Sequence, residues 1–516
     1  MIKSVLVLGA GSAGLIAALS LKRKIPELKV TVVGSSEIGV IGVGEGTNPN
    51  FPTLLFDYLG ISRRRFFAEA EPTWKIGARF LWGPRGRFDY TFSQQLDAQW
   101  SDMPKPNGYY CDDDFRCCDV AAACMAYDKV FPRQANGGGP DIQDWHAFHI
   151  ENHKLVGVLE SIGRESGVEF IDAKVSSVER GSAGVAALHL GDGRRLEADL
   201  FVDASGFRSE LLGRALEEPY VPFDHSLFCD RAAIGGWTRT DEPILPYTTA
   251  ETMECGWAWQ IEHEHFVNRG YVFSSRFLSD DEAVAEFRRK NPKIREARIV
   301  KFQSGRYRRM WVDNVVAIGN SSGFVEPLEA TALMIVCAAS QGLVSFLQNG
   351  GMTVTESMRK LYNRRIVGMW DDVRDFLGLH YRYNTRLDTP YWRQCWHETD
   401  LSGISDLLEY YEENGPTGFG RYLLRTHENS WGIEGYLVML VGNRVPYRAR
   451  HRATAAEHEA WNRHRTRFST TARNGMNVRE ALACIRNPNW HWNDERPGIH
   501  KVTAGGPFSA MQIYRH

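Results

Sequence analysis

The N-terminal stretch constrains the fold most, because a short apolar run there meets a glycine-rich turn and a helix-forming segment. Val5 to Leu8 has the pattern of a strand, and Ala13 to Leu21 has the alanine and leucine content of a helix. Between them, Gly9, Gly11 and Gly14 have the spacing GxGxxG. In such a unit the glycines permit the turn, the close approach of backbone to a pyrophosphate, and the packing of helix on strand. Because the helix N-terminus points at the phosphates, the stretch predicts a dinucleotide site.

The second strand of this unit, Lys29 to Val33, departs from the usual pattern at its end. An acid in that position normally holds the adenosine ribose, but here the strand ends in Gly34 and the nearest carboxylate is Glu37. We therefore expect Glu37 to reach the ribose by a slightly longer path. The motif alone leaves FAD and NAD open as the cofactor.

The composition favours a small molecule as the partner. The 516 residues include 61 Lys and Arg and 63 Asp and Glu, so no general field attracts nucleic acid or an anionic membrane. The apolar stretch Ala332 to Leu347 is interrupted by polar residues and is too short to span a bilayer. The nine cysteines contain no CxxC pair and predict free thiols, and neither they nor the histidines have the spacing of a metal site. We expect a cytoplasmic protein.

Two later stretches repeat the pattern of a buried strand that opens onto small residues. Ala198 to Asp203 runs into Ala-Ser-Gly, and Asn314 to Gly319 runs into Asn-Ser-Ser-Gly before a helix. Each can bring backbone close to a bound dinucleotide. Together with the first turn, they predict that three turns contribute to one dinucleotide site. A domain that binds only NAD would not need the last two turns.

The remaining segments give a coarse outline. Thr73 to Trp82 alternates roughly as one strand that carries Lys75, and a lysine on a strand is usually solvated. The segments 167–172, 175–178 and 185–190 have the pattern of successive strands of a small meander. From about residue 355 helix formers and large aromatics dominate, and the basic run 444–467 is typical of a solvated helix face rather than of a nucleic-acid contact.

Several motifs occur together in the order and spacing of one known family. Besides 9–14 they are 42–49 (GVGEGTNP), 74–80 (WKIGARF), 256–261 (GWAWQI), 319–332 (GNSSGFVEPLEATA), 370–376 (WDDVRDF) and 388–392 (DTPYW). The chain thereby resembles the flavin-dependent tryptophan halogenases. In such enzymes reduced FAD reacts with oxygen to give a flavin hydroperoxide, which a halide attacks. The hypohalous acid then crosses an internal passage to a lysine beside the aromatic substrate.

The resemblance implies an α/β fold. We expect an FAD-binding Rossmann-like fold interleaved with a β-rich substrate layer in residues 1–354, and a mainly helical C-terminal module in residues 355–516 that covers the substrate site. The FAD contacts that the resemblance implies are Gly9, Gly11, Ser12, Ala13, Gly14, Glu37, Val43, Gly44, Glu45, Gly319, Asn320 and Leu333.

The resemblance also assigns the catalytic positions. The lysine is Lys75, whose amine would hold hypohalous acid or become a haloamine, and burial among apolar neighbours would favour its neutral form. Glu329 matches the second catalytic residue, a carboxylate that can stabilise an arenium cation and assist the loss of its proton. The amides of Thr331 and Ala332, at a helix start, match the halide site.

The chain departs from the family at two places. One is the strip 257–262, which in the family forms the wall between the flavin and the organic substrate, and the other is the substrate site. Glu262 stands where a proline is usual, Ala330 replaces a serine, and Ala332 replaces a glycine. The aromatic positions of the indole sandwich are matched by Tyr90, Phe92 and Trp431. However, residues 419–430 show no recognisable equivalent of the paired tyrosines and acid that grip the amino-acid backbone of tryptophan. Since a buried zwitterion would then be poorly compensated, we expect a larger indole-bearing or other arene rather than free tryptophan.

Two other functions use the same scaffold. An FAD-dependent aromatic monooxygenase would transfer oxygen from the flavin directly to the substrate, and a flavin-binding protein would not halogenate at all. Lys75, Glu329 and the Trp257 and Trp259 strip favour the halogenase. With one complete dinucleotide fingerprint, the chain is expected to depend on a separate NAD(P)H flavin reductase. The sequence leaves open whether the protein forms a homodimer.

Overall fold

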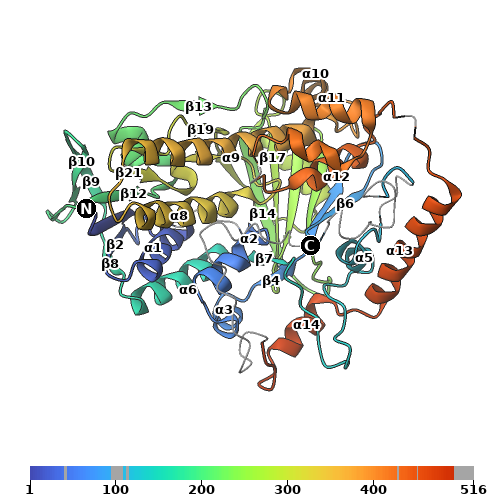
Figure 1. Ribbon diagram of the computed structural model, residues 1–516, viewed down its shortest axis with the longest axis horizontal. Coiled ribbons are helices and arrows are strands. Elements are labelled where there is room, and N and C mark those ends of the chain that lie inside the picture. Colours follow the sequence, from blue (N-terminus) through green and yellow to red (C-terminus); the bar gives the residue numbers. More distant parts are fainter. Residues whose placement is uncertain (40–43, 94–107, 112–115, 427–428, 450, 493–516) are drawn as a thin grey trace.

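The computed structural model describes residues 1–39, 44–93, 108–111, 116–426, 429–449 and 451–492. Two large sheets organise these residues, and long helices run between and around them (Figure 1). The predicted α/β class is confirmed. Val43, one of the predicted FAD contacts, lies outside the described residues.

A six-stranded sheet carries the glycine-rich turns. Its order is β20 (Trp311–Val312), β21 (Val315–Ala317), β12 (Leu200–Asp203), β1 (Ser4–Leu8), β2 (Lys29–Gly34) and β8 (Glu169–Asp172). All neighbours except the β20–β21 pair run parallel. α1 (Ser12–Lys24) packs between α6 (Asn152–Glu165) and α8 (Thr331–Asn349). Because β1, β12 and β21 are parallel neighbours, their carboxyl ends meet at one edge, as the prediction of one site built from three turns requires.

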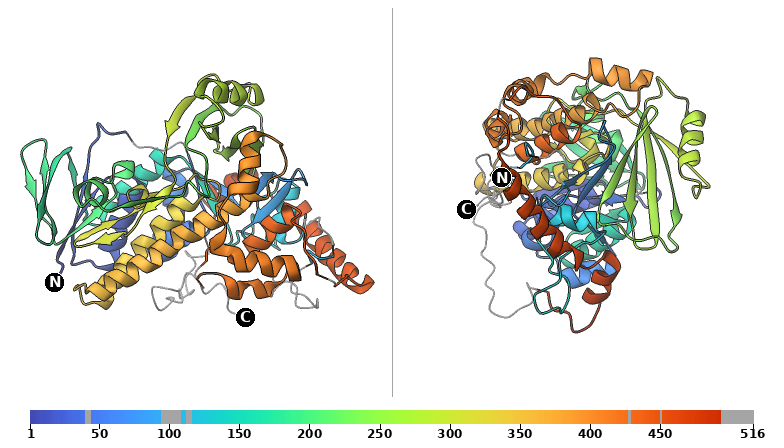
Figure 2. Two further views of the ribbon diagram at one scale, coloured as in Figure 1. Left: turned by 90° about the horizontal axis from the view of Figure 1, so that it is seen from above. Right: turned by 90° about the vertical axis from the view of Figure 1, so that its right-hand side faces the viewer.

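A seven-stranded sheet forms the second layer. Its order is β18 (Arg298–Lys301), β14 (Arg231–Thr238), β17 (Phe266–Phe273), β16 (Gly256–Glu262), β15 (Thr248–Met253), β5 (Gly77–Leu81) and β6 (Phe88–Thr91). The side chains of β16 alternate, so Trp257 and Trp259 face the main core while Ala258 faces the outer cluster. α7 (Asp280–Lys290) covers that outer face (Figure 2).

Three small sheets accompany these layers, and two of them correct the sequence prediction. The first contains β3 (Glu45–Gly46), β7 (Ala147–Ile150) and β4 (Thr73–Lys75), so the single strand predicted for Thr73 to Trp82 is wrong. The chain leaves this sheet at Ile76, whose N–H donates to the Pro246 carbonyl, and enters the seven-stranded sheet as β5. The second contains β9 (Val175–Gly181), β10 (Gly184–Leu190) and β11 (Arg195–Leu196). β8 does not belong to this meander, because it pairs with β2. The third contains β13 (Tyr220–Pro222), β19 (Gly305–Tyr307) and β22 (Gly323–Phe324).

The C-terminal part is helical, as predicted. α9 (Glu356–Arg382) begins after Thr355, whose hydroxyl accepts from the Met358 N–H, and lies along α8 (Figure 1). The helices that follow are α10 (Pro390–Glu398), α11 (Ser405–Asn414), α12 (Gly432–Gly442), α13 (Ala455–Arg473) and α14 (Val478–Ile485). Helix thus covers the basic run 444–467 only from Ala455 onward. The division into modules 1–354 and 355–516 stays a prediction.

Shorter helices complete the described chain. They are α2 (Asn50–Pro52), η1 (Thr53–Tyr58), α3 (Arg63–Glu69), α5 (Val120–Ala126), η2 (Gly206–Arg208), η3 (Glu210–Ala215), η4 (Gly319–Ser321), η5 (Ser402–Ile404) and η6 (Gly418–Leu423). α8 is long and apolar enough to cross a membrane, but 72% of its most apolar window is buried within the protein. That burial is what a core helix shows, since α8 packs on both α1 and α9.

Candidate active site

A cavity of about 1340 Å³ opens at the shared edge of β1, β12 and β21. All three predicted turns line it, through residues 9–13, 204–206 and 319–320. The predicted cofactor contacts that line it are Gly9, Gly11, Ser12, Ala13, Glu37, Glu45, Gly319, Asn320 and Leu333. Asp172 and Trp370 also line the cavity, although the sequence did not predict them as cofactor contacts. The cavity is large enough for a dinucleotide.

The first turn has the shape of a pyrophosphate cradle. Gly9 has φ +119°, and a Cβ there would lie 2.1 Å from the Ala204 carbonyl oxygen, so only glycine fits. A Cβ on Gly14 would lie 2.0 Å from the Gly9 oxygen, which explains why Gly14 packs helix on strand and does not line the cavity. A Cβ on Gly11 would meet nothing within 4 Å, so that side is open to a ligand. No side chain caps α1 at Gly11, which leaves the first amides of the helix available to phosphates.

Two of the predicted contacts have specific surroundings. A Cβ on Gly34 would lie 2.5 Å from the Ala10 Cβ, so an acid has no room at the end of β2. Glu37 lines the cavity nearby and pairs with Lys174. Gly44 is absent from the lining, because it faces the His263 ring, where a Cβ would lie 2.4 Å from Nε2.

Glu45 is the ionisable group of β3 that reaches the cavity. Burial raises the pKa of its carboxyl to about 7. A substantial share of Glu45 is therefore protonated at neutral pH and can donate a hydrogen bond.

The N-terminus of α8 is open in the same way as that of α1. Ala330 is its N-cap, has the left-handed φ of 55° and provides no side-chain hydrogen bond. The hydroxyl of Thr331, the first helical residue, is buried and finds no hydrogen-bond partner in the described part of the chain. Ala332 lines the large cavity. The arrangement offers helix-start amides and an unpaired hydroxyl next to that cavity, which suits an anion.

Lys75 ends β4 and is buried, with 3% of its surface exposed. Lys75 thus departs from the solvated position that is usual for a lysine on a strand, and its predicted burial is confirmed. Burial lowers the pKa of Lys75 to about 8, and Glu329 opposes that shift. Its Nζ lies 5.3 Å from the centroid of the Phe92 ring. Part of the Lys75 population is therefore uncharged near neutral pH, as a nucleophilic amine requires.

Glu329 lies just before α8, in the loop that ends in Ala330. It is 7% exposed, and its Oε1 is 2.8 Å from Nε2 of His380 in α9. Nδ1 of the same ring is 2.7 Å from the Phe376 carbonyl oxygen. The sequence interpretation did not include His380, because it lies one helical turn beyond the last matching motif on α9 and far from Glu329 in sequence.

The wall strand β16 is fixed by two buried carboxylates. Glu326 Oε2 accepts from Trp257 Nε1 at 2.8 Å and from the Tyr381 hydroxyl, and burial raises the pKa of Glu326 to about 7. Glu262, which takes the place of a proline, pairs with Arg239 and accepts from Gln260 at 2.6 Å. An ion pair therefore anchors the end of this strand where the family uses a rigid ring.

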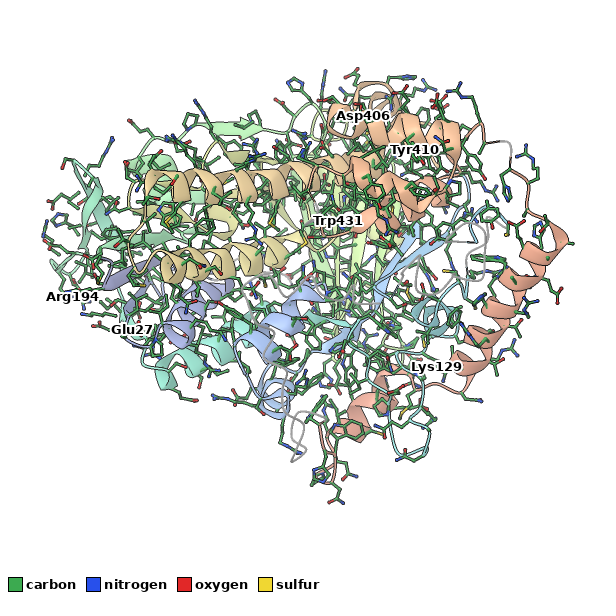
Figure 3. All side chains as sticks on the ribbon, in the orientation of Figure 1. Glu27, Lys129, Arg194, Asp406, Tyr410 and Trp431 are labelled. Atoms are coloured by element: carbon green, nitrogen blue, oxygen red, sulfur yellow. The ribbon has the colours of Figure 1, made fainter. Side chains whose placement is uncertain are left out.

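Two of the aromatic candidates, Trp431 and Tyr90, contact the ring of Phe376. Trp431, labelled in Figure 3 at the start of α12, stacks on Phe376 with a centroid distance of 4.3 Å and an interplanar angle of 24°. Tyr90 in β6 meets the same ring edge-on at 6.5 Å. One face of Trp431 is thus covered by Phe376, while Phe92 lies nearer to Lys75.

The segment before Trp431 is tied to α9. Arg425 pairs with Asp375 at 2.6 Å and with Asp372 at 3.3 Å, and Thr426 donates to Asp372 at 3.1 Å. Asn429 donates to the Tyr436 hydroxyl at 3.2 Å. These polar groups stabilise the segment itself, so they are not available to a substrate zwitterion.

Comparisons with known proteins point in one direction. The model of the family described as tryptophan halogenase matches residues 4–459. The tryptophan 7-halogenase RebH of Lentzea aerocolonigenes is 30% identical over 86% of this chain and 89% of its own length. The crystal structure of MibH, a lanthipeptide tryptophan 5-halogenase, has a TM-score of 0.85 at 36% identity and covers 94% of this chain and 93% of its own. BrvH, a flavin-dependent halogenase from Brevundimonas sp. BAL3, has a TM-score of 0.82 at 27% identity, covering 94% and 99%.

Proposed function

The chain belongs to the tryptophan halogenase family, and from this premise we propose that it halogenates an electron-rich, indole-bearing arene with reduced FAD, oxygen and a halide. The observation that carries the proposal is the buried amine of Lys75 beside the carboxylate of Glu329, apart from the residues that line the dinucleotide cavity. A hydroxylase would need no such lysine, since its flavin would act directly on the substrate.

FAD fits the cavity because the first turn leaves the Gly11 side open and the α1 amides uncapped. The residues proposed to hold it are the predicted contacts that line the cavity, and Gly14 supports the turn by packing helix on strand. Contacts from Gly44 and from Val43, which lies outside the described residues, stay predictions. When bound and reduced, FAD supplies hypohalous acid from oxygen and halide. We propose bromide or chloride as the halide, held by the amides of Thr331 and Ala332 and by the Thr331 hydroxyl.

Lys75 and Glu329 are proposed to act on the arene. The neutral Lys75 amine accepts or hydrogen-bonds the electrophilic halogen and directs it to one ring carbon. Glu329 stabilises the cationic ring and removes its proton. Phe92, Tyr90 and Trp431 are proposed to hold the flat ring by aromatic contact. The buried thiols of Cys118, Cys124, Cys229, Cys255, Cys337 and Cys395 are free, which supports a cytoplasmic location.

The indole is proposed to be part of a molecule larger than free tryptophan. The polar groups of Arg425, Thr426 and Asn429 bond within the protein and stabilise the segment that carries them. Phe419 and Tyr422, on the turn that packs against α12, are 65% and 74% exposed, which gives apolar surface outside the ring site. MibH, which acts on a lanthipeptide tryptophan, is a relative with this kind of substrate.

A substrate panel tests both the reaction and the substrate class. With reductase, oxygen and bromide or chloride, we expect a product whose mass shift follows the halide supplied. N-acetyl-L-tryptophan amide should exceed free L-tryptophan in kcat/KM by at least about tenfold, because an uncompensated buried charge costs more than the ~1.4 kcal/mol that corresponds to tenfold. Both compounds have the same indole. A hydroxylated product without halide would indicate a monooxygenase, and no product from any arene would indicate a flavin-binding protein.

The purified chain should bind FAD but not reduce it with NAD(P)H. The three turns converge on one cavity, which FAD would occupy, so none of them is left to hold a second dinucleotide. Stopped-flow absorbance would show oxidised flavin persisting with NADPH and disappearing after a separate reductase is added. Rapid bleaching of the flavin by NADPH alone would contradict this dependence.

A further inference from the structure

The two ring nitrogens of His380 have different partners, and these partners fix its protonation. The Phe376 carbonyl, 2.7 Å from Nδ1, can only accept a hydrogen bond, so Nδ1 carries a hydrogen. Nε2 of a neutral ring is then itself an acceptor. It lies 2.8 Å from Glu329 Oε1, which also only accepts when the carboxylate is ionised. One additional proton must therefore lie between Nε2 and Oε1.

That proton makes the His380–Glu329 pair electrically neutral. It is either an imidazolium beside a carboxylate or an imidazole beside a carboxylic acid, and the summed charge is zero in both cases. The pair is buried, with His380 at 0% and Glu329 at 7% exposure and the His380 ring against Phe80 and Phe376. Water therefore does not screen its charges from their neighbours.

Lys75 is the neighbour that responds to this charge. Among described residues, the ionisable groups that act on it are Glu329, from the loop before α8, and His149, from β7. Burial, with Lys75 as a further cause, lowers the pKa of His149 well below its usual value, so His149 contributes no charge at neutral pH. Burial favours the uncharged amine of Lys75, and a bare Glu329 carboxylate would oppose it.

We propose that His380 is a positioning residue that keeps the Lys75 amine uncharged, because it supplies the proton that cancels the charge of Glu329. This inference rests on the proposed function. The same proton holds the Glu329 side chain in one orientation toward the ring site. His380 thus acts through Lys75 and Glu329 and needs no contact with the substrate.

Replacing His380 with Gln tests the inference. The amide of Gln reaches the position of Nε2 and can still donate to Glu329, but it cannot hold the extra proton. Glu329 then becomes a bare carboxylate, which raises the pKa of Lys75, so the rise of arene halogenation with pH should move upward by about 1 to 2 pH units. The measurement is the fraction of hypohalous acid that reaches the arene at each pH. Acid that escapes is captured by a thioether in solution.

The matched control is His189→Gln in β10. His189 also faces a glutamate, with Nε2 3.0 Å from Glu179, but it is partly exposed and far from Lys75 in the fold. The pH profile of arene halogenation by His189→Gln should therefore equal that of the wild type. A His380→Gln enzyme whose profile also equals the wild type would overturn the inference. If the wild-type enzyme halogenates no arene, the proposed function fails instead, so the two failures are distinguishable.

A second measurement needs no variant. Neutron diffraction from wild-type crystals at neutral pD should show a deuteron on Nδ1 and one between Nε2 and Glu329 Oε1. If the space between Nε2 and Oε1 holds no deuteron, the pair is not neutral and the inference is wrong, even if His380→Gln does not fold.

Discussion

Replacing Lys75 with Met should lower arene halogenation by at least about 1,000-fold while leaving FAD binding and hypohalous acid formation near wild-type levels. Met keeps the apolar stem that fills the buried site but removes the amine. A positioned reacting group contributes effective molarities of about 10⁵ to 10⁸ M, so its loss should affect the transfer step far more than it affects folding. The measurements are halogenated product per turnover, hypohalous acid captured in solution, and FAD affinity.

Two variants sharpen this result. Lys75→Arg keeps a cation and hydrogen-bond donors but stays charged at every accessible pH, so it should be as inactive as Lys75→Met if a neutral amine is required. Lys360→Met, the same substitution on the exposed face of α9, should have no effect. Regioselective product from Lys75→Met at a near-normal rate would remove the main reason for calling the chain a halogenase.

The sequence predicted well what depends on neighbouring residues. The GxGxxG spacing fixes a left-handed Gly9 and the close approach of Gly14, and both can be inferred from residues within one turn. The burial of the strands before Ala204 and Gly319 follows from their apolar runs, and parallel pairing then brings all three turns to one cavity.

Features that depend on tertiary contacts were not predictable in this way. Thr73 to Trp82 alternates as one strand, but the hydrogen bond from Ile76 to the Pro246 carbonyl divides it between two sheets. The environment of Lys75 follows from that division, since the residue ends a strand inside the protein. His380 carries no local signal, because the hydrogen bond that matters joins its Nε2 to Glu329, in a loop 51 residues earlier in the chain.

The prediction that free tryptophan is not the substrate also depends on tertiary contacts. Arg425, Thr426 and Asn429 carry polar groups that could bind a ligand, and the sequence shows only that residues 419–430 differ from the family pattern. Their bonds to Asp372, Asp375 and Tyr436 show how they are used. An Arg425 paired with two carboxylates already has its charge compensated, so binding a substrate carboxylate would require breaking that pairing.

Replacing Glu329 with Gln should lower kcat for arene halogenation by about 10² to 10⁴-fold, the range for loss of a positioned general base. The Gln side chain has the same shape, and its amide can donate to Nε2 of His380, so the packing around α8 and α9 should persist. Without the carboxylate, the cationic ring loses its proton acceptor and the negative end of the neutral His380–Glu329 pair. FAD binding and escape of hypohalous acid into solution should remain.

Deuterium at the reacting ring carbon distinguishes these two roles of Glu329. If the carboxylate removes the proton, its loss makes proton removal slow, and Glu329→Gln should show a primary isotope effect larger than that of the wild type. If Glu329 only stabilises the cation, ring attack stays slow and the isotope effect should not change. A Glu329→Gln enzyme with wild-type kcat would show that neither role applies. The pair with His380 would then serve only to set the charge state of Lys75.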